Sequence, residues 1–309
     1  MNHIPVLLKE SINSLNIKSN GIYIDATYGC GGHTKLILSK LGINGRIYAV
    51  DCDITTILKY KILDKRIIYI HNNFSNLKFI LNNKIGKIDG ILFDLGISSF
   101  QLNNPKRGFS YMFNGPLDMR INQNQNINAY NLLQKISERK LSEILKLYGE
   151  EKFHKKIAFN IKKYLLNNKL NNTKDLSHSI CSVFKKKNKF KHPARRSFQA
   201  IRIFLNKEIE ELQKALNISL DLLKKNGIIS VISFHSLEDR IVKNFMKKNS
   251  LHNKNIFKKI PLTEIEINNL YYKNNNLKLK IIDRIFPNKI EILKNLRSRS
   301  AILRVAKKI

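Results

Sequence analysis

Short apolar runs alternate with amphipathic stretches through residues 21–100 of the chain. Brief apolar runs separated by helical periodicity are typical of βαβ units, which build a parallel sheet with helices on both faces. The pattern predicts strands over 22–25, 46–50, 67–70 and 88–93.

The alternation stops after about residue 104, because residues 105–205 contain no convincing β run. Helical periodicity there covers 132–148, 153–166 and 173–184. The earlier pattern then returns with a predicted helix over 208–225 and strands over 228–233 and 300–306, whereas the Asn- and Lys-rich residues 250–280 predict a loop. We therefore expect an α/β fold with a doubly wound sheet, formed by 1–104 and 206–309 and interrupted by a helical insertion over 105–205.

A glycine-rich loop, Asp25-Ala-Thr-Tyr-Gly-Cys-Gly-Gly-His-Thr34, joins the first predicted strand to a predicted helix. Strand, glycine turn and helix together let the backbone approach a nucleotide-like ligand at a helix N-terminus. Asp51 ends the next strand roughly 20 residues later, where a carboxylate can accept hydrogen bonds from ribose hydroxyls. The sequence therefore predicts a cofactor that contains a ribose.

Two cofactors fit this loop to different degrees. A dinucleotide site requires a third glycine, but Thr34 stands there. Asp25 precedes the loop, and its charge suits the cationic end of S-adenosylmethionine better than a pyrophosphate. Asp25 could equally cap the turn, and Asp53 is expected to cap a helix. S-adenosylmethionine is the favoured cofactor, and NAD is the alternative.

A second acidic loop, Asp94-Leu-Gly-Ile-Ser-Ser-Phe-Gln-Leu102, follows the fourth predicted strand. Ligands of open α/β sheets lie beyond the carboxyl ends of strands, so this loop is expected to face the cofactor. Four segments further downstream are dominated by polar and charged residues together with rigid Gly or Pro, a composition that packing in a hydrophobic core does not need. They are 107–110, 115–120, 192–202 and 233–240.

The composition points to a polyanionic partner. The chain carries 56 Lys and Arg against 23 Asp and Glu, a formal net charge of +33, and such a field attracts nucleic acid. Biased codon usage could produce part of this excess. The three cysteines are too few and scattered for a disulfide framework or zinc cluster, and no metal site is expected. No apolar run is long enough for a membrane span, so the chain is expected to be cytoplasmic.

The motifs, in this order, resemble the bacterial 16S ribosomal RNA (cytosine-N4)-methyltransferase family of the MraW or RsmH type. The resemblance extends from His3-Ile-Pro-Val-Leu-Leu8 to Arg297-Ser-Arg-Ser-Ala301, and departures such as Phe100, where the family often has proline, are modest. It implies a class I methyltransferase fold with a helical insertion for substrate recognition. It also implies S-adenosyl-L-methionine as cofactor and, as partner, 16S ribosomal RNA in the small subunit, whose decoding-centre cytidine is methylated on N4.

The same resemblance implies a set of cofactor contacts, namely Gly31, Gly32, His33, Asp51, Phe74, Asp94 and Gln101. Asp94 is also the candidate catalytic residue, because an acceptor at the exocyclic amine would localise its lone pair and take up developing positive charge.

The target base must leave its stack to reach the cofactor. Phe109, Tyr111 and Phe113 are candidate stacking surfaces, with packing of the insertion onto the sheet as the alternative. The basic cluster Lys185–Arg196 is expected to follow phosphates. His192 and His235 could contact substrate or serve the structure, and Glu238 and Asp239 most simply start a helix.

Other functions remain open from sequence alone. They are a methyltransferase that acts on another nucleic acid or on protein, and a non-catalytic RNA-binding assembly factor. The sequence also leaves open the oligomeric state and whether the substrate is free RNA or an assembled subunit.

Overall fold

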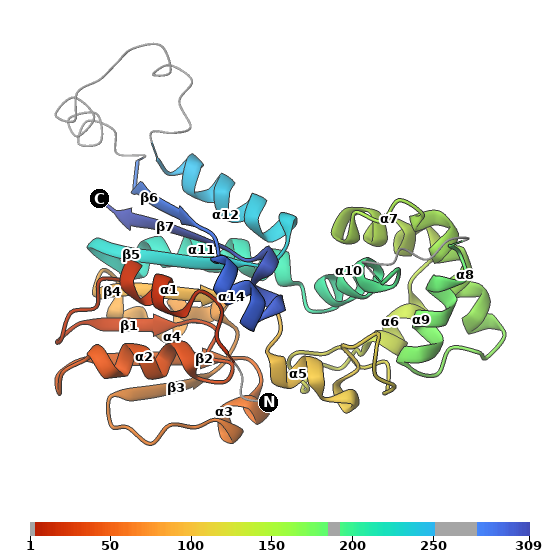
Figure 1. Ribbon diagram of the computed structural model, residues 1–309, viewed down its shortest axis with the longest axis horizontal. Coiled ribbons are helices and arrows are strands. Elements are labelled where there is room, and N and C mark those ends of the chain that lie inside the picture. Colours follow the sequence, from red (N-terminus) through yellow and green to blue (C-terminus); the bar gives the residue numbers. More distant parts are fainter. Residues whose placement is uncertain (1–3, 185–191, 251–276) are drawn as a thin grey trace, which may run out of the picture. The chain divides into compact units, whose positions relative to one another are not determined.

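The computed structural model describes residues 4–184, 192–250 and 277–309. The chain forms two compact units, Met1–Gly96 with Glu211–Ile309, and Ile97–Glu210 (Figure 1). All strands of the sheet belong to the first unit, and the second unit is helical.

The first unit is built on a seven-stranded sheet of order β3-β2-β1-β4-β5-β7-β6. Only β7 runs against the others, since it pairs antiparallel with both β5 and β6 while the remaining pairs are parallel. This arrangement confirms the class I methyltransferase fold. The strands are β1 Ile22–Asp25, β2 Arg46–Asp51, β3 Ile67–His71, β4 Ile88–Asp94, β5 Leu223–Ser233, β6 Leu279–Ile285 and β7 Ile302–Lys308.

Successive residues of a strand point to opposite faces, and each face has its own core. Ile24 and Phe93 pack on one face with residues of α4, α11 and α12, whereas Tyr23 and Leu92 pack on the other with α1 and α2. The helices of this unit are α1 Leu8–Ser14, α2 Gly32–Lys40, α3 Ile54–Lys59, α4 Leu77–Ile80, α11 Glu208–Leu222, α12 Ser236–Lys248 and α14 Lys289–Lys294; α11 begins at the unit boundary.

The second unit has an apolar core of its own, to which Leu145, Ile157 and Phe198 contribute buried side chains. Its helices are α5 Ser99–Asn103, α6 Ala129–Lys135, α7 Glu138–Gly149, α8 His154–Leu166, α9 Thr173–Cys181 and α10 Arg195–Leu205. The described residues of the predicted insertion, 105–184 and 192–205, belong to this unit.

The unit is larger than the predicted insertion at both ends. Ile97 and Leu102 pack against its core, so the chain enters it before residue 105. At the other end, the side chain of Asn206 accepts a hydrogen bond from the Ile121 amide and donates one to the Met119 carbonyl, both at 2.8 Å. Side-chain contacts between residues distant in the chain therefore set the boundaries of the second unit. The hydrophobic periodicity of the sequence does not reveal such contacts.

Several predicted elements need correction. The helix expected over 132–148 is two helices, because Ser137 accepts a hydrogen bond from the Lys140 amide and caps α7. The helix expected over 208–225 ends at Leu222, since Leu223 already pairs with Ile88 in the sheet. Strand β6 falls partly in the expected loop over 250–280, of which 251–276 lie outside the described residues.

Candidate functional site

Asp25 fixes the loop between β1 and α2 through hydrogen bonds to residues of that loop. This carboxylate is fully buried, accepts a hydrogen bond from the Thr34 hydroxyl at 2.7 Å, and accepts a second from the Thr27 amide at 3.2 Å. Burial raises the pKa of Asp25 to about 6, although the hydrogen bonds from Thr34 and Thr27 oppose the rise. Asp25 therefore holds the loop in shape, which is the capping role left open from sequence.

Asp51 links this loop to the end of β2. Its Oδ2 accepts a hydrogen bond from the Gly29 amide and its Oδ1 accepts one from the Asp53 amide, both at 2.9 Å. Burial raises the pKa of Asp51 to about 6, against the effect of these two amides. Each carboxylate oxygen has a further lone pair for an incoming hydroxyl. Asp53, as predicted, caps α3, with its side chain accepting from the Thr55 amide.

Asp94 ends β4, which lies beside β1 in the sheet. Its amide donates to the Thr27 hydroxyl at 2.6 Å, and its Oδ2 lies 3.7 Å from Nδ1 of His33. Its Oδ1 is buried and has no hydrogen-bond partner. Burial first, and then the nearby charges of Asp25 and Glu238, raise the pKa of Asp94 well above its usual range. A buried acceptor without a hydrogen-bond partner is costly in a folded protein, and a bound ligand is one way to satisfy it.

The N-terminal segment, residues 4–7, packs against the glycine loop. The Val6 carbonyl lies 3.2 Å from His33 Nε2, and a β-carbon added at Gly32 would lie 2.2 Å from Cγ of Pro5. The segment is held in turn by α14 and the turn after it. The Leu7 amide donates to Glu291 Oε1 at 2.8 Å, and the Asn295 side chain donates to the Ile4 carbonyl at 3.0 Å.

Glu291 therefore influences the glycine loop indirectly, because it binds the N-terminal segment that packs against that loop. Glu291→Ala leaves the amide of buried Leu7 without an acceptor, at a cost of roughly 1–3 kcal/mol. We expect the Kd for S-adenosylmethionine to rise about fivefold to tenfold, and isothermal titration calorimetry measures it. Glu291→Gln keeps an acceptor oxygen and should bind nearly as the unchanged protein does.

Glu143→Ala, which removes an exposed carboxylate of α7, is the matched control for the lost charge. Equal Kd changes for Glu291→Ala and Glu143→Ala would show that the contact with Leu7 does not shape the loop.

The remaining predicted cofactor contacts divide between the two units. Phe74 follows β3, is partly buried, and its ring packs edge-on against that of Phe93 with centroids 5.8 Å apart. Gln101 belongs to the second unit and lies in the first turn of α5, where its Oε1 accepts from the Ser98 amide at 3.0 Å. In the first unit the structure thus brings Gly31, Gly32, His33, Asp51, Phe74 and Asp94 to the ends of neighbouring strands.

Most of the residues proposed to contact RNA have structural partners. Phe109 is buried in the core of the second unit, so its expected stacking role is wrong. Tyr111 stacks on His192 with centroids 4.7 Å apart, whereas Phe113 is half exposed. His235 caps α12 by accepting from the Glu238 amide, which also confirms the helix expected to start there.

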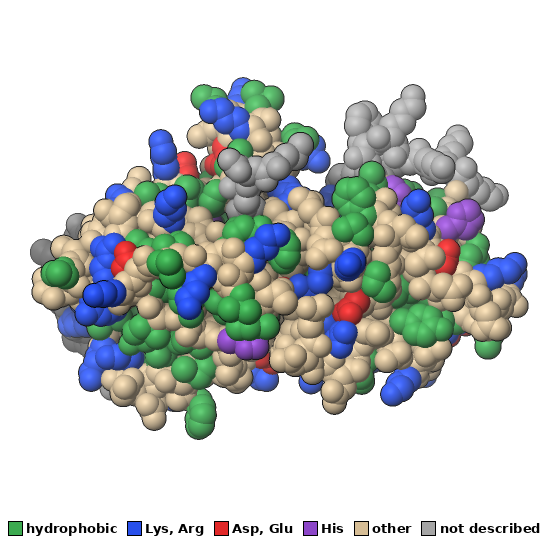
Figure 2. Space-filling model, turned by 90° about the horizontal axis from the view of Figure 1, so that it is seen from below, with side chains coloured by type: hydrophobic (Ala, Val, Ile, Leu, Met, Phe, Trp, Pro, Cys, Tyr) green, Lys and Arg blue, Asp and Glu red, His purple; other side chains and the backbone are tan. Residues whose placement is uncertain are grey.

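Surface charge does not by itself locate an RNA site. In Figure 2, Lys and Arg side chains are spread over the face that is drawn, with few Asp or Glu among them. Of the predicted basic cluster 185–196, residues 185–191 lie outside the described residues. No helix in the described ranges combines the length and hydropathy that crossing a bilayer demands.

Sequence reasoning missed several groups that shape the site. Thr27 and Thr34 lie in the glycine-rich loop, where the hydroxyl of Thr34 contacts Asp25 and that of Thr27 contacts Asp94. Hydroxyl side chains within this loop were the feature of the sequence from which both contacts could have been suspected. Glu291 and the Val6 carbonyl gave no signal, because their partners are distant in the chain.

Comparisons with known proteins agree over the full length. The model of a family described as the MraW methylase family matches residues 1–309. The protein named ribosomal RNA small subunit methyltransferase H of Buchnera aphidicola subsp. Acyrthosiphon pisum (strain APS) is 52% identical over 308 residues, covering 98% of this chain and 97% of that protein. The protein of the same name from Wigglesworthia glossinidia brevipalpis is 49% identical over 315 residues, covering 99% of each.

Proposed function

The chain belongs to the MraW methylase family, and from this we propose that it methylates 16S ribosomal RNA on the exocyclic N4 of a decoding-centre cytidine, with S-adenosylmethionine as methyl donor. The observation that carries the proposal is the position of Asp94, which ends β4 beside the glycine loop with one buried oxygen that lacks a partner. We propose that this oxygen accepts a hydrogen bond from the amine that is methylated.

The residues of the first unit fit the cofactor, which supplies a methyl group on a sulfonium centre. Gly31 adopts a left-handed conformation at the start of α2, and Gly32 lies too close to Pro5 for any side chain. Neither position can therefore take a side chain unless the loop shifts, so both glycines are needed for the shape of the loop. We assign cofactor binding to these glycines with His33, Asp51, Phe74 and Asp94, and the proposed contact of Gln101 rests on the family resemblance alone.

Asp94 is proposed to act on the amine. The exocyclic nitrogen of cytosine is a poor nucleophile, because its lone pair is delocalised into the ring. A hydrogen bond from that nitrogen to Asp94 would localise the lone pair and stabilise the positive charge that develops during attack. Since the reacting atoms must also be held in line, a rigid strand end is a suitable support for the acceptor.

Recognition of RNA is assigned to the helical unit and to the excess of positive charge. The target base is read after it leaves its stack, and the substrate is proposed to be the small subunit or its precursor. This function places the enzyme in the cytoplasm, where ribosomal subunits are assembled.

Transfer of tritiated methyl groups tests the proposal. The purified protein is incubated with labelled S-adenosylmethionine and either small subunits that lack the modification, free 16S RNA, or DNA. We expect label in 16S RNA, recovered as N4-methylated cytidine after digestion. Label in DNA alone supports an enzyme for another nucleic acid. RNA binding without label in any substrate supports a non-catalytic assembly factor, and either result overturns the proposal.

A further inference from the structure

Helix α8 presents a lysine-rich face with an exposed aromatic ring at its centre. The Phe159 side chain is 57% exposed. Lys155, Lys156 and Lys163 are also exposed. Lys155 and Lys156 precede Phe159 by four and three residues, and Lys163 follows it by four. This spacing places the three lysines around the ring on one side of the helix. We call these four residues the α8 face.

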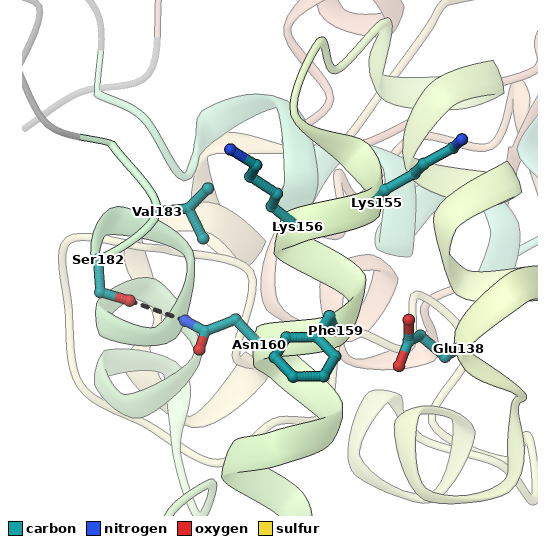
Figure 3. A pocket seen from close by; sticks show the side chains of 7 residues that line it. All are labelled: Glu138, Lys155, Lys156, Phe159, Asn160, Ser182 and Val183. Carbon is teal, nitrogen blue, oxygen red and sulfur yellow. Dashed lines mark hydrogen bonds between the residues drawn. The ribbon is translucent and has the colours of Figure 1, made fainter.

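The α8 face borders an open hollow of ≈ 480 Å³ (Figure 3). The hollow is lined by Glu138 from α7, by Lys155, Lys156, Phe159 and Asn160 from α8, and by Ser182 and Val183 after α9. Its two sides are tied together, because the Asn160 side chain donates to the Ser182 hydroxyl at 2.7 Å and also to the Ser179 carbonyl. The hollow therefore lies within one packed group of helices.

The lysines do not shield the ring from water. Lysine stems often lie along apolar surface and cover it, but more than half of the Phe159 side chain is still accessible. An exposed ring contributes little to folding, so its burial against a partner would be favourable.

The one acidic side chain that lines the hollow is already compensated. Glu138 occupies the first turn of α7, where a negative charge interacts well with the helix dipole. It also lies close enough to Lys162 to raise the pKa of that lysine, although burial outweighs it and the net pKa of Lys162 is lowered. Lys162 itself donates to the carbonyls of Leu133 and Gln134. The lysines of the α8 face are thus left to attract an anion.

We propose that the α8 face binds a single-stranded segment of the substrate RNA, with a base stacked on Phe159 and the flanking phosphates held by Lys155 and Lys156. Aromatic rings among basic side chains are the common means of holding unpaired nucleotides. The inference rests on the proposed function and deepens it, because it adds an RNA contact in the second unit that is separate from the methyl-transfer residues.

Substitutions of Phe159 test the stacking. Phe159→Ala should raise the Kd for 16S RNA and the KM for RNA about tenfold, while kcat and the Kd for S-adenosylmethionine stay unchanged. Phe159→Leu keeps an apolar side chain and should show the same loss, whereas Phe159→Trp should bind RNA as the unchanged protein does. Equal losses in all three variants, or none in Phe159→Ala, would overturn the stacking role. Circular dichroism and thermal unfolding check that each variant folds.

Substitutions of the lysines test the phosphate contacts. For Lys155→Gln with Lys156→Gln, the slope of log Kd against log salt should be shallower by about 1.4, since each contact with single-stranded nucleic acid contributes roughly 0.7. Lys146→Gln with Lys169→Gln removes two exposed lysines of the same unit as a matched control. An unchanged slope, or weaker binding to assembled subunits but not to free RNA, would overturn the inference, and the second result would indicate a ribosomal protein as the partner.

The binding measurements need no turnover, so the two proposals fail separately. If the unchanged protein transfers no label to ribosomal RNA, the proposed function fails. If it transfers label while the α8 variants bind RNA normally, only the α8 inference fails.

Discussion

Asp94→Asn is expected to lower kcat roughly 100- to 1,000-fold, the range found when one preorganised electrostatic partner of a transition state is removed. The Kd for S-adenosylmethionine should change by no more than about threefold, because asparagine has nearly the same shape. An amide oxygen can still accept a hydrogen bond, but it carries no charge to balance the cationic amine. Single-turnover transfer to small subunits measures the rate. A normal rate in a variant that binds cofactor normally would rule out the proposed role.

The same residue is expected to set a pH dependence. Because the pKa of Asp94 is raised, the carboxylate form is lost as pH falls through that value, and the rate should fall with it. The Asp94→Asn variant should lack this limb of the pH profile. A profile of unchanged shape in Asp94→Asn would assign the limb to another group.

Folding stability should depend on pH in the opposite direction to the rate. The folded protein holds the Asp94 proton more firmly than the unfolded chain, so the contribution of Asp94 to folding stability is full below about pH 4 and is lost as pH rises through the raised pKa. Asp94→Asn removes this loss and should unfold at the same or a higher temperature near neutral pH.

Much of the first unit could be predicted from sequence, because its buried strands are short apolar runs, and β1, β2 and β4 each end in an acid. Strand β6 is the exception. It lies at the sheet edge, and Asp283 and Arg284 within it are exposed, so it lacks the apolar run on which the other predictions rest. The acids at the ends of β2 and β4 were found because strand ends in a parallel sheet meet at one edge.

The polar motifs downstream were harder to interpret, because charged residues serve structure and function alike. Arg107 is buried and donates to the carbonyls of Arg120 and Ile121, while Arg202 pairs with Glu208 at 2.8 Å. Arg304 pairs with Asp239 in the same way at 2.7 Å. Which carboxylate or carbonyl an arginine contacts depends on tertiary structure, so these contacts could not be derived from spacing.

Gly31→Ala is expected to raise the Kd for S-adenosylmethionine about 100-fold. Gly31 has a φ of +75° at the start of α2, and an added β-carbon would lie 2.7 Å from the hydroxyl oxygen of Tyr28. Tyr28 is buried, and its hydroxyl donates to the Tyr60 carbonyl, so the ring has no room to move aside. The loop must shift instead. Losing two or three hydrogen bonds between the loop and the cofactor, at about 1 kcal/mol each, accounts for the expected rise in Kd.

Gly86→Ala separates the conformational strain from the steric effect. Gly86 has nearly the same backbone conformation, with φ of +67°, but an added β-carbon would meet no atom within 4 Å. Both variants should lose about 1–2 kcal/mol of unfolding free energy to the left-handed conformation, measured by denaturant titration. Only Gly31→Ala should also lose cofactor affinity, because only that β-carbon displaces the loop that Asp25 and Asp51 hold in place. If the two variants bind the cofactor equally well, the shape of the glycine loop does not determine binding, and the assignment of the cofactor site to it is wrong.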